Sequence, residues 1–145
     1  MRPGRIRVLA LGIIWRGDEL LLMKGYDPAK RQTFYRPLGG GVEFGERARD
    51  ALIREFNEEL DADLVNIRYL GTLENIFTFD GQPGHEILLL FAAEFADTAL
   101  YARGDLVASE DQERIPTAWK RLAECTDETP LYPEGLRDLL AGHSS

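Results

Sequence analysis

The chain has 145 residues, of which 44% are hydrophobic and 29% are charged, as expected for one globular domain with its own core. Its formal net charge of −8 argues against nonspecific binding to nucleic acid or to an anionic membrane. The single cysteine, Cys125, excludes an internal disulfide and a cysteine metal site, which fits a reducing cytoplasm. We therefore expect one cytoplasmic domain over residues 1–145, with no nucleic-acid or membrane partner.

The N-terminal part of the sequence predicts a β-hairpin. Ile6 to Trp15 is rich in β-branched and aliphatic residues and is typical of a buried strand. Arg16-Gly17-Asp18 indicates a turn, and Glu19 to Lys24 is expected to return as the partner strand. The early apolar run is too short to span a bilayer, and no signal peptide is recognisable.

Residues 27–36 are expected to form a polar loop in which aromatic and cationic side chains are interleaved. Aromatic rings suit base stacking, and cations suit pairing with phosphate. Candidate substrate-binding residues are Tyr35 and Arg36, together with Lys24 at the end of the preceding strand. An ordinary solvated loop is the alternative for each of them. Arg36 is the best single candidate because it lies just before a run of glycines.

A glycine-rich loop, Gly39-Gly40-Gly41, leads into a helix expected over Glu46 to Leu60. This segment contains neither Pro nor Gly, and its apolar residues recur at every fourth position: Ala48, Leu52, Phe56 and Leu60. Glu46 is expected in the first turn, where the helix dipole favours a carboxylate. Asp61 is expected to end the helix, because Asp tolerates the left-handed conformation.

Three glutamates gather on this helix. Glu55, Glu58 and Glu59 are spaced i, i+3, i+4, so their carboxylates converge on one side. At about 100° per residue, Glu59 points about 20° from Leu52, within the apolar stripe. Like charges repel, and a carboxylate aimed at the core resists desolvation, so a cation is needed beyond Arg54. Hard carboxylate oxygens select Mg²⁺ or Mn²⁺, although a solvated acidic face is the ordinary interpretation of a charge run.

Beyond this helix, Leu64 to Phe79 is expected to form one strand or two, bent at Gly71. A turn over residues 80–84 precedes a buried strand from His85 to Phe95. Glu86, near the start of that strand, is a candidate substrate contact, and a solvated strand end is the alternative.

The C-terminal part is less strongly patterned. Residues 97–116 are expected to be irregular and acidic. Trp119 is placed on a short strand, where it packs rather than catalyses. The last helix is expected over Pro133 to Leu140, with Pro in the favourable first turn.

The stretch from Gly40 to Ala62 resembles the Nudix box, G-x5-E-x7-R-E-U-x-E-E-x-G-U, where U is a bulky or aliphatic residue. Every fixed letter matches except the late glycine, which is Asp61 here. Family members more often have Leu-Pro-Gly-Gly where this chain has Pro37-Leu38-Gly39-Gly40. The resemblance implies an α/β (α+β) fold, an α/β/α sandwich with a central mixed β-sheet, in a single Nudix hydrolase domain.

The resemblance also implies divalent-metal-dependent hydrolysis of a diphosphate linkage in a nucleoside diphosphate derivative, by attack of water on phosphorus. Mg²⁺ or Mn²⁺ would be the cofactor, with the number of ions open. The residues implied are, as metal ligands, Gly40, Glu55, Glu58 and Glu59, and, as residues that orient them, Arg54 and Glu46. The general base stays open among Glu55, Glu58 and a loop acid, Glu110 or Glu113.

Two alternatives to an enzyme remain. A non-catalytic Nudix-like module would bind a nucleotide and regulate another protein, but such modules usually lose box glutamates, and none is lost here. A purely structural domain with an acidic helix would show no response to Mg²⁺. The nucleotide substrate stays open among nucleoside triphosphates, ADP-ribose, nucleotide sugars and dinucleoside polyphosphates. The oligomeric state is open too, and a homodimer is compatible with the sequence.

Overall fold

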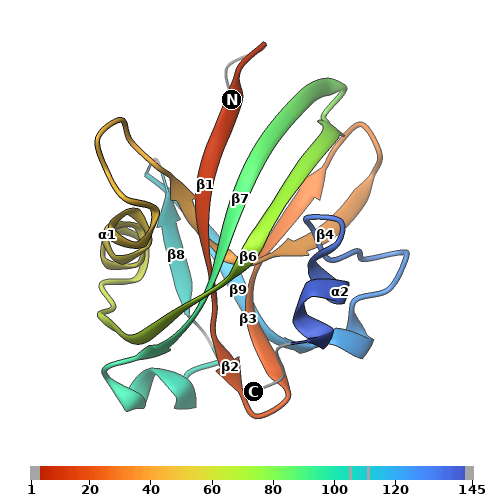
Figure 1. Ribbon diagram of the computed structural model, residues 1–145. Helices are drawn as coiled ribbons and strands as arrows, with labels where there is room; N and C mark the ends of the chain where they lie inside the picture. Colours follow the sequence, from red (N-terminus) through yellow and green to blue (C-terminus); the bar gives the residue numbers. More distant parts are fainter. Residues whose placement is uncertain (1–3, 105, 111, 143–145) are drawn as a thin grey trace.

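The computed structural model describes residues 4–104, 106–110 and 112–142 (Figure 1). The strands are, in chain order, β1 (Ile6–Ile13), β2 (Trp15–Arg16), β3 (Glu19–Asp27), β4 (Gln32–Arg36), β5 (Leu38–Gly41), β6 (Leu64–Phe79), β7 (Gln82–Phe95), β8 (Val107–Glu110) and β9 (Glu113–Arg121). The α-helices are α1 (Ala48–Leu60) and α2 (Leu136–Ala141), and short 3-10 helices cover Thr98–Ala102 and Leu122–Glu124.

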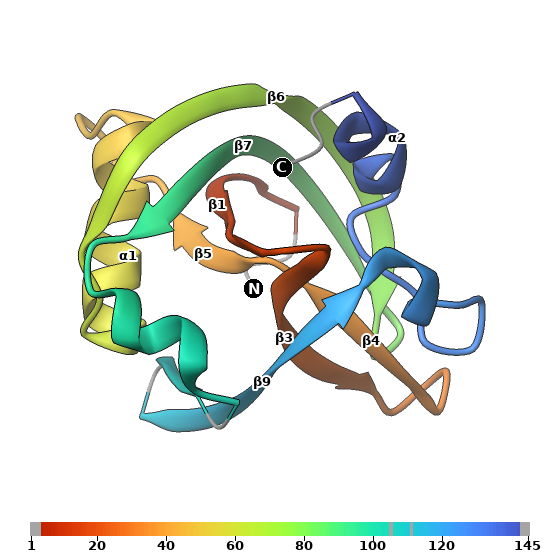
Figure 2. The same ribbon diagram turned by 90° about the horizontal axis from the view of Figure 1, so that it is seen from below.

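The strands form two sheets between the helices. The first has four strands in the order β5-β1-β7-β6 and is mixed, because β1 runs parallel to β7 while the other neighbours are antiparallel. The second follows the order β2-β3-β9-β8, with β4 also paired to β3. Figure 2 shows α1 and α2 on opposite sides of the strands, which confirms the mixed α+β fold expected from the sequence.

The predicted N-terminal hairpin is only partly right. The chain changes sheets at Ile14, so β1 pairs with β5 and β7, and only Trp15–Arg16 pairs with β3. The turn at Gly17-Asp18 is confirmed. The hairpin pattern was visible in the sequence, but the long-range partners of β1 were not.

Two segments expected to be loops are strands. Gln32–Arg36 pairs with the end of β3, which leaves only residues 28–31 as the connection. Gly39, Gly40 and Gly41 pair with Leu11, Ala10 and Leu9 of β1. Glycine has a low strand propensity, so here the neighbouring strand imposes the extended conformation.

The helix α1 begins two residues later than predicted. Arg47 is its N-cap and Asp50 is the acid in its first turn. Glu46 precedes the helix, and its side chain binds Arg54. At the other end, Asp61 is left-handed, with φ 52° and ψ 41°, and its N–H bonds to the Asn57 carbonyl, as predicted. The buried side chains of α1 are Ala51, Leu52, Phe56 and Glu59.

In the second half of the chain, β6 is one strand, with two register shifts against β7, between Val65 and Arg68 and between Tyr69 and Gly71. The turn is shorter than predicted, because β7 already begins at Gln82. Residues 97–116 are not irregular throughout, since they hold a 3-10 helix, β8 and the start of β9. The last helix begins at Leu136 after the left-handed Gly135, so Pro133 lies before it.

Two apolar clusters form the core. One surrounds Phe56 and Leu52 of α1, and the other surrounds Leu136 of α2 with Leu11, Leu22 and Leu88 from the sheets. The packing of α1 therefore fixes its glutamates relative to β5 and β1. Within the described ranges, no helix is long and apolar enough to cross a membrane.

Candidate active site

The glycine strand lies directly against the glutamates of α1. A Cβ atom built on Gly40 would overlap the Glu55 carboxylate, so a larger residue would displace that side chain. Gly39 has φ 146°, and a Cβ there would overlap the carbonyl of Ala10. Position 39 requires glycine because its backbone approaches β1 closely at a positive φ, and glycine at position 40 leaves room for the Glu55 carboxylate.

Arg54 connects the box residues to one another. Its Nε and Nη2 donate to the two carboxylate oxygens of Glu46 at 2.8 and 2.9 Å. Its Nη1 donates to Glu55 at 3.0 Å and to Glu58 at 3.3 Å, and Nη2 also donates to the Gly41 carbonyl at 3.0 Å. The guanidinium thus fixes the loop before α1, strand β5 and two glutamates in one arrangement.

These contacts change the acidity of the partners. The hydrogen bonds from Arg54 lower the pKa of Glu46 to about 2, assisted by the backbone N–H of Glu43. The hydrogen bonds to Glu46 and Glu55 raise the pKa of Arg54 above its ordinary value. Glu46 therefore stays ionised. It anchors Arg54, which in turn contacts the other glutamates.

Glu59 has the most unusual environment in the site. Only 5% of the residue is exposed, and neither carboxylate oxygen has a hydrogen-bond partner among the described residues. Burial raises its pKa to about 9, reinforced by the negative charges of Glu110 and Glu55 and partly opposed by Arg36. Burial and the neighbouring negative charges therefore disfavour the charged form of this carboxyl group, and a nearby cation would favour it.

A polar cavity of about 260 Å³ joins these elements. Gly40, Glu55, Glu58, Glu59 and Arg36, all predicted from the sequence, line it together. Glu110 of β8 lines it as well, whereas Glu113 is exposed and lines neither this cavity nor its neighbour. The remaining polar contribution comes from Arg7 of β1 and Ser109 of β8.

The donor set fits a hard divalent cation. As the side chains lie, no three His, Cys, Asp or Glu residues of the described chain are already gathered to hold a metal ion. Glu55 and Glu58 are instead bonded to Arg54. The unpartnered oxygens of Glu59 and the surrounding carboxylates are nevertheless the ligands that Mg²⁺ or Mn²⁺ prefers.

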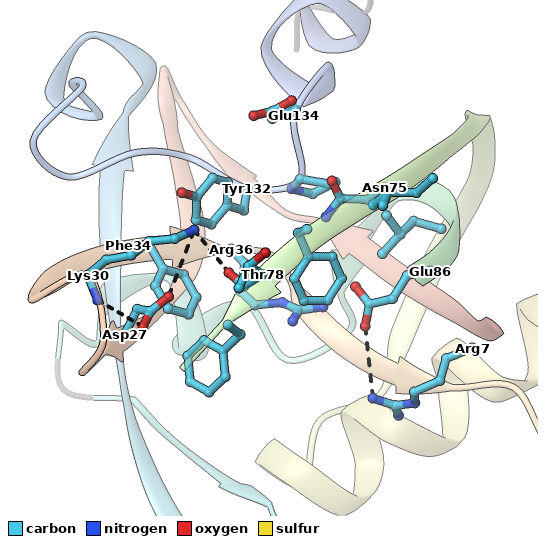
Figure 3. Close-up of a pocket in the computed structure, with 15 residues that line it drawn as sticks. Arg7, Asp27, Lys30, Phe34, Arg36, Asn75, Thr78, Glu86, Tyr132 and Glu134 are labelled. Carbon is cyan, nitrogen blue, oxygen red and sulfur yellow. Dashed lines mark hydrogen bonds and ion pairs between the residues drawn. The ribbon is translucent and has the colours of Figure 1, made fainter. Parts of the chain in front are cut away.

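A second cavity of about 290 Å³ adjoins the first and is lined by aromatic rings (Figure 3). Four of its residues are aromatic: Phe34, Phe77, Phe79 and Tyr132. Arg7 and Arg36 line both cavities, so two positively charged side chains lie where the cavities meet. Glu86 also faces this second cavity and is only 4% exposed, so the solvated strand end considered from the sequence is wrong.

Two candidate substrate residues lie elsewhere. Tyr35 is buried in the core with the Lys120 ammonium 5.2 Å from its ring centre, and Lys24 is exposed and lines neither cavity. Successive side chains of a strand point to opposite faces, so β4 directs Phe34 and Arg36 to the cavities and Tyr35 away from them. The segment was expected to be a loop, for which this alternation could not be applied.

Sequence reasoning missed Arg7 and the aromatic residues of β6. Arg7 stands beside Glu86 through the parallel pairing of β1 with β7. These strands are far apart in the sequence, and no local pattern predicts that pairing.

The chain is similar to known proteins in both sequence and fold. A family model described as the NUDIX domain matches residues 5–138. The chain is 36% identical over 108 residues to the NAD-capped RNA hydrolase NudC of Pseudomonas fluorescens (strain Pf0-1), a match that covers 74% of this chain and 34% of that protein. NudC of Pseudomonas aeruginosa (strain LESB58) is 32% identical over 100 residues, covering 69% of this chain and 31% of that protein. This chain thus spans about a third of the length of these relatives.

Solved structures share the fold. A MutT NUDIX hydrolase from Burkholderia pseudomallei superimposes with a TM-score of 0.68 at 22% identity, covering 97% of this chain and 99% of the other. The E. coli ORF135 protein gives a TM-score of 0.60 at 25% identity, covering 97% and 95% of the two chains.

The relatives also bear on the expected partners. NudC is named as a hydrolase of NAD-capped RNA, so the expectation that excluded nucleic acid is not supported. Because the NUDIX domain model matches residues 5–138, this protein belongs to the Nudix family.

Proposed function

We propose that this protein hydrolyses a diphosphate linkage in a nucleoside diphosphate derivative, with Mg²⁺ or Mn²⁺ as cofactor. The observation that carries the proposal is the buried Glu59 carboxyl group, whose oxygens have no hydrogen-bond partner in the described chain while they face a cavity lined by Glu55 and Glu58. Without a cation, this cluster combines burial with like-charge repulsion, and both are unfavourable for folding.

Glu55, Glu58, Glu59 and the Gly40 carbonyl would hold the cation, which would supply positive charge to offset the phosphates and to make a water molecule more acidic. Arg54 would orient Glu55 and Glu58 through its Nη1, while its Nε is hydrogen-bonded to Glu46. The proton of the attacking water would pass to a carboxylate at the cavity wall, for which Glu55, Glu58 and Glu110 are the candidates.

Arg36 and Arg7 would bind the phosphates. Both line the polar cavity, and both also line the aromatic cavity beside it. A guanidinium forms charge-assisted, often bidentate bonds with phosphate oxygens, so these residues would hold a diphosphate across the junction. The phosphates would then lie against α1 and the nucleoside on the aromatic side.

The reaction is tested by measuring phosphate and nucleoside monophosphate release from a substrate panel with Mg²⁺, with Mn²⁺ and with chelator. The panel contains nucleoside triphosphates, ADP-ribose, nucleotide sugars, dinucleoside polyphosphates and, because of the NudC relatives, a NAD-capped RNA. Cleavage that needs the metal supports the proposal. Tight nucleotide binding without cleavage of any substrate would instead favour a regulatory binding module.

Glu58→Gln provides the residue-level test. The Glu58 side chain is 59% exposed, so its replacement should leave folding intact while lowering turnover by about 10²-fold or more. Glu94→Gln is the matched control, because Glu94 is an exposed carboxylate of β7 that lines neither cavity. Near-normal turnover of Glu58→Gln would remove Glu58 from the proposed site.

A further inference from the structure

A row of polar side chains crosses three neighbouring strands beneath the aromatic cavity. Asn75 of β6 is paired directly with Glu86 of β7, and Glu86 is paired directly with Arg7 of β1. All three residues line the aromatic cavity (Figure 3). At the far end of the row, the Arg7 guanidinium lies beside Gly41 of β5, where the polar cavity begins. The row therefore leads from the rings to the glutamates of α1.

Glu86 is placed to receive a ligand, in contrast to Asp27, the other buried acid of this cavity. The Asp27 Oδ1 already accepts bonds from the backbone N–H groups of Ala29, Lys30 and Asp80 at 3.0 to 3.3 Å. Through these hydrogen bonds Asp27 links the β3–β4 turn to the β6–β7 turn. The Glu86 side chain is 5% exposed, and the ion pair to Arg7 is long, at 3.9 Å. At that distance Arg7 balances the charge and, as far as the described residues go, leaves the carboxylate oxygens free to accept hydrogen bonds.

Aromatic rings that pack against one another line this part of the cavity. Phe34 packs edge-on against Phe79 with centroids 6.0 Å apart, and it lies 5.4 Å from the Tyr132 ring. Aromatic faces stack on any nucleobase, so they provide affinity without distinguishing one base from another. The distinction must come from the polar groups at the cavity wall, and a carboxylate can only accept hydrogen bonds.

We propose that Glu86 selects a guanine-type base in the aromatic cavity by accepting two N–H bonds from its Watson–Crick edge. Guanine presents a ring N–H and an amino group side by side, which match the two oxygens of one carboxylate. Adenine presents one amino group beside a ring acceptor, which would face a carboxylate oxygen unfavourably. This inference rests on the proposed function, because phosphates held at the polar cavity would place the base here.

The wild-type protein tests the inference through the binding of GMP, IMP and AMP, measured by isothermal titration calorimetry with Mg²⁺. IMP keeps the ring N–H but lacks the amino group, and AMP lacks both donors of the guanine edge. We expect GMP to bind about tenfold more tightly than IMP, and at least about tenfold more tightly than AMP. The reason is that hydrogen bonds to charged groups are stronger than hydrogen bonds between neutral groups. Equal affinity for GMP and AMP would overturn the assignment.

The variant Glu86→Gln gives a sharper test. An amide offers one acceptor and one donor, a pattern complementary to the adenine edge. The variant should therefore lose about tenfold or more in GMP affinity while it gains affinity for AMP. A merely structural Glu86 would weaken both nucleotides equally, and that result would overturn the proposal. Glu94→Gln, on the same strand but outside both cavities, should keep the wild-type order.

The two proposals fail in different ways. A guanine preference in binding, without cleavage of any panel substrate, would support the role of Glu86 and overturn the hydrolase function. Metal-dependent cleavage without any preference for guanine over adenine would overturn the role of Glu86 and leave the hydrolase function standing.

Discussion

The Glu59 side chain connects the stability of the fold to the chemistry of the site. The helix periodicity places it among the apolar residues of α1, and the structure confirms that it is buried there. Ionising a buried carboxyl group near Glu55 and Glu110 is unfavourable, so its pKa rises to about 9. The protein therefore carries a group that weakens its own stability at neutral pH, as is common where a site must bind a cation.

Glu59→Gln should stabilise the metal-free protein above pH 5. The ordinary pKa of the carboxyl group is 4.5 and the folded value is about 9, so between these values the folded protein binds more protons than the unfolded chain. The free energy of unfolding must then fall as the pH rises through that window. A neutral amide removes this dependence and should raise stability by about 1–3 kcal/mol at pH 8. Urea denaturation at pH 5, 7 and 8 with chelator measures it. A wild-type stability that is flat across this range would contradict the expectation.

Arg54→Lys should lower turnover by about 10–100-fold, the range found when residues behind metal ligands are replaced. Lysine keeps the charge, but it cannot bond Glu46, Glu55 and the Gly41 carbonyl at once as the guanidinium does. The steady-state rate under saturating Mg²⁺ is the measurement. Arg49→Lys on the same helix is the control, because Arg49 is exposed and lines neither cavity. Equal losses in the two variants would mean that Arg54 acts only through helix stability.

Helix α1 could be predicted almost completely from the sequence, whereas its surroundings could not. Its apolar period, its freedom from Pro and Gly, and its left-handed end at Asp61 are local properties of consecutive residues. Strands β4 and β5 were expected to be loops, because their conformation depends on pairing with β3 and β1. That pairing joins residues far apart in the sequence. For the same reason, the sequence did not show that Tyr35 lies in the core or that Arg7 lines the cavities. Local patterns thus supplied the residues proposed to bind metal, and tertiary pairing supplied the rest of the candidate site.

Asp61→Gly should stabilise the protein by a few tenths to about 1 kcal/mol, since glycine adopts the left-handed conformation without a Cβ penalty. The gain in the folded state is partly offset by the greater freedom of glycine in the unfolded chain. Thermal unfolding compares this variant with Asp50→Gly, in which the same substitution inside the first turn of α1 should destabilise the protein. If both variants lose stability, Asp61 must contribute a favourable interaction that outweighs its strain.

The whole molecule carries a formal net charge of −8, and several of its acids face one cavity. This charge made binding to nucleic acid unexpected on the basis of sequence. It does not prevent binding of a phosphorylated ligand, however, because Arg7 and Arg36 stand at the junction of the two cavities. A divalent cation would offset further negative charge in the same place, so cation binding should be visible in the stability of the entire fold.

Mg²⁺ or Mn²⁺ should therefore raise the melting temperature, and chelator should reverse the change. A cation present at ten times its dissociation constant adds about 1.4 kcal/mol to the free energy of unfolding, which corresponds to a shift of a few degrees for a domain of this size. General screening of the acidic surface would also stabilise the protein, so NaCl at matched ionic strength is the necessary control. Differential scanning fluorimetry should show a divalent-specific shift in the wild type that is reduced in Glu59→Gln, because a neutral amide replaces the buried carboxylate in that variant. The same shift with NaCl, or an undiminished shift in Glu59→Gln, would mean that the box glutamates form an acidic face rather than a metal site.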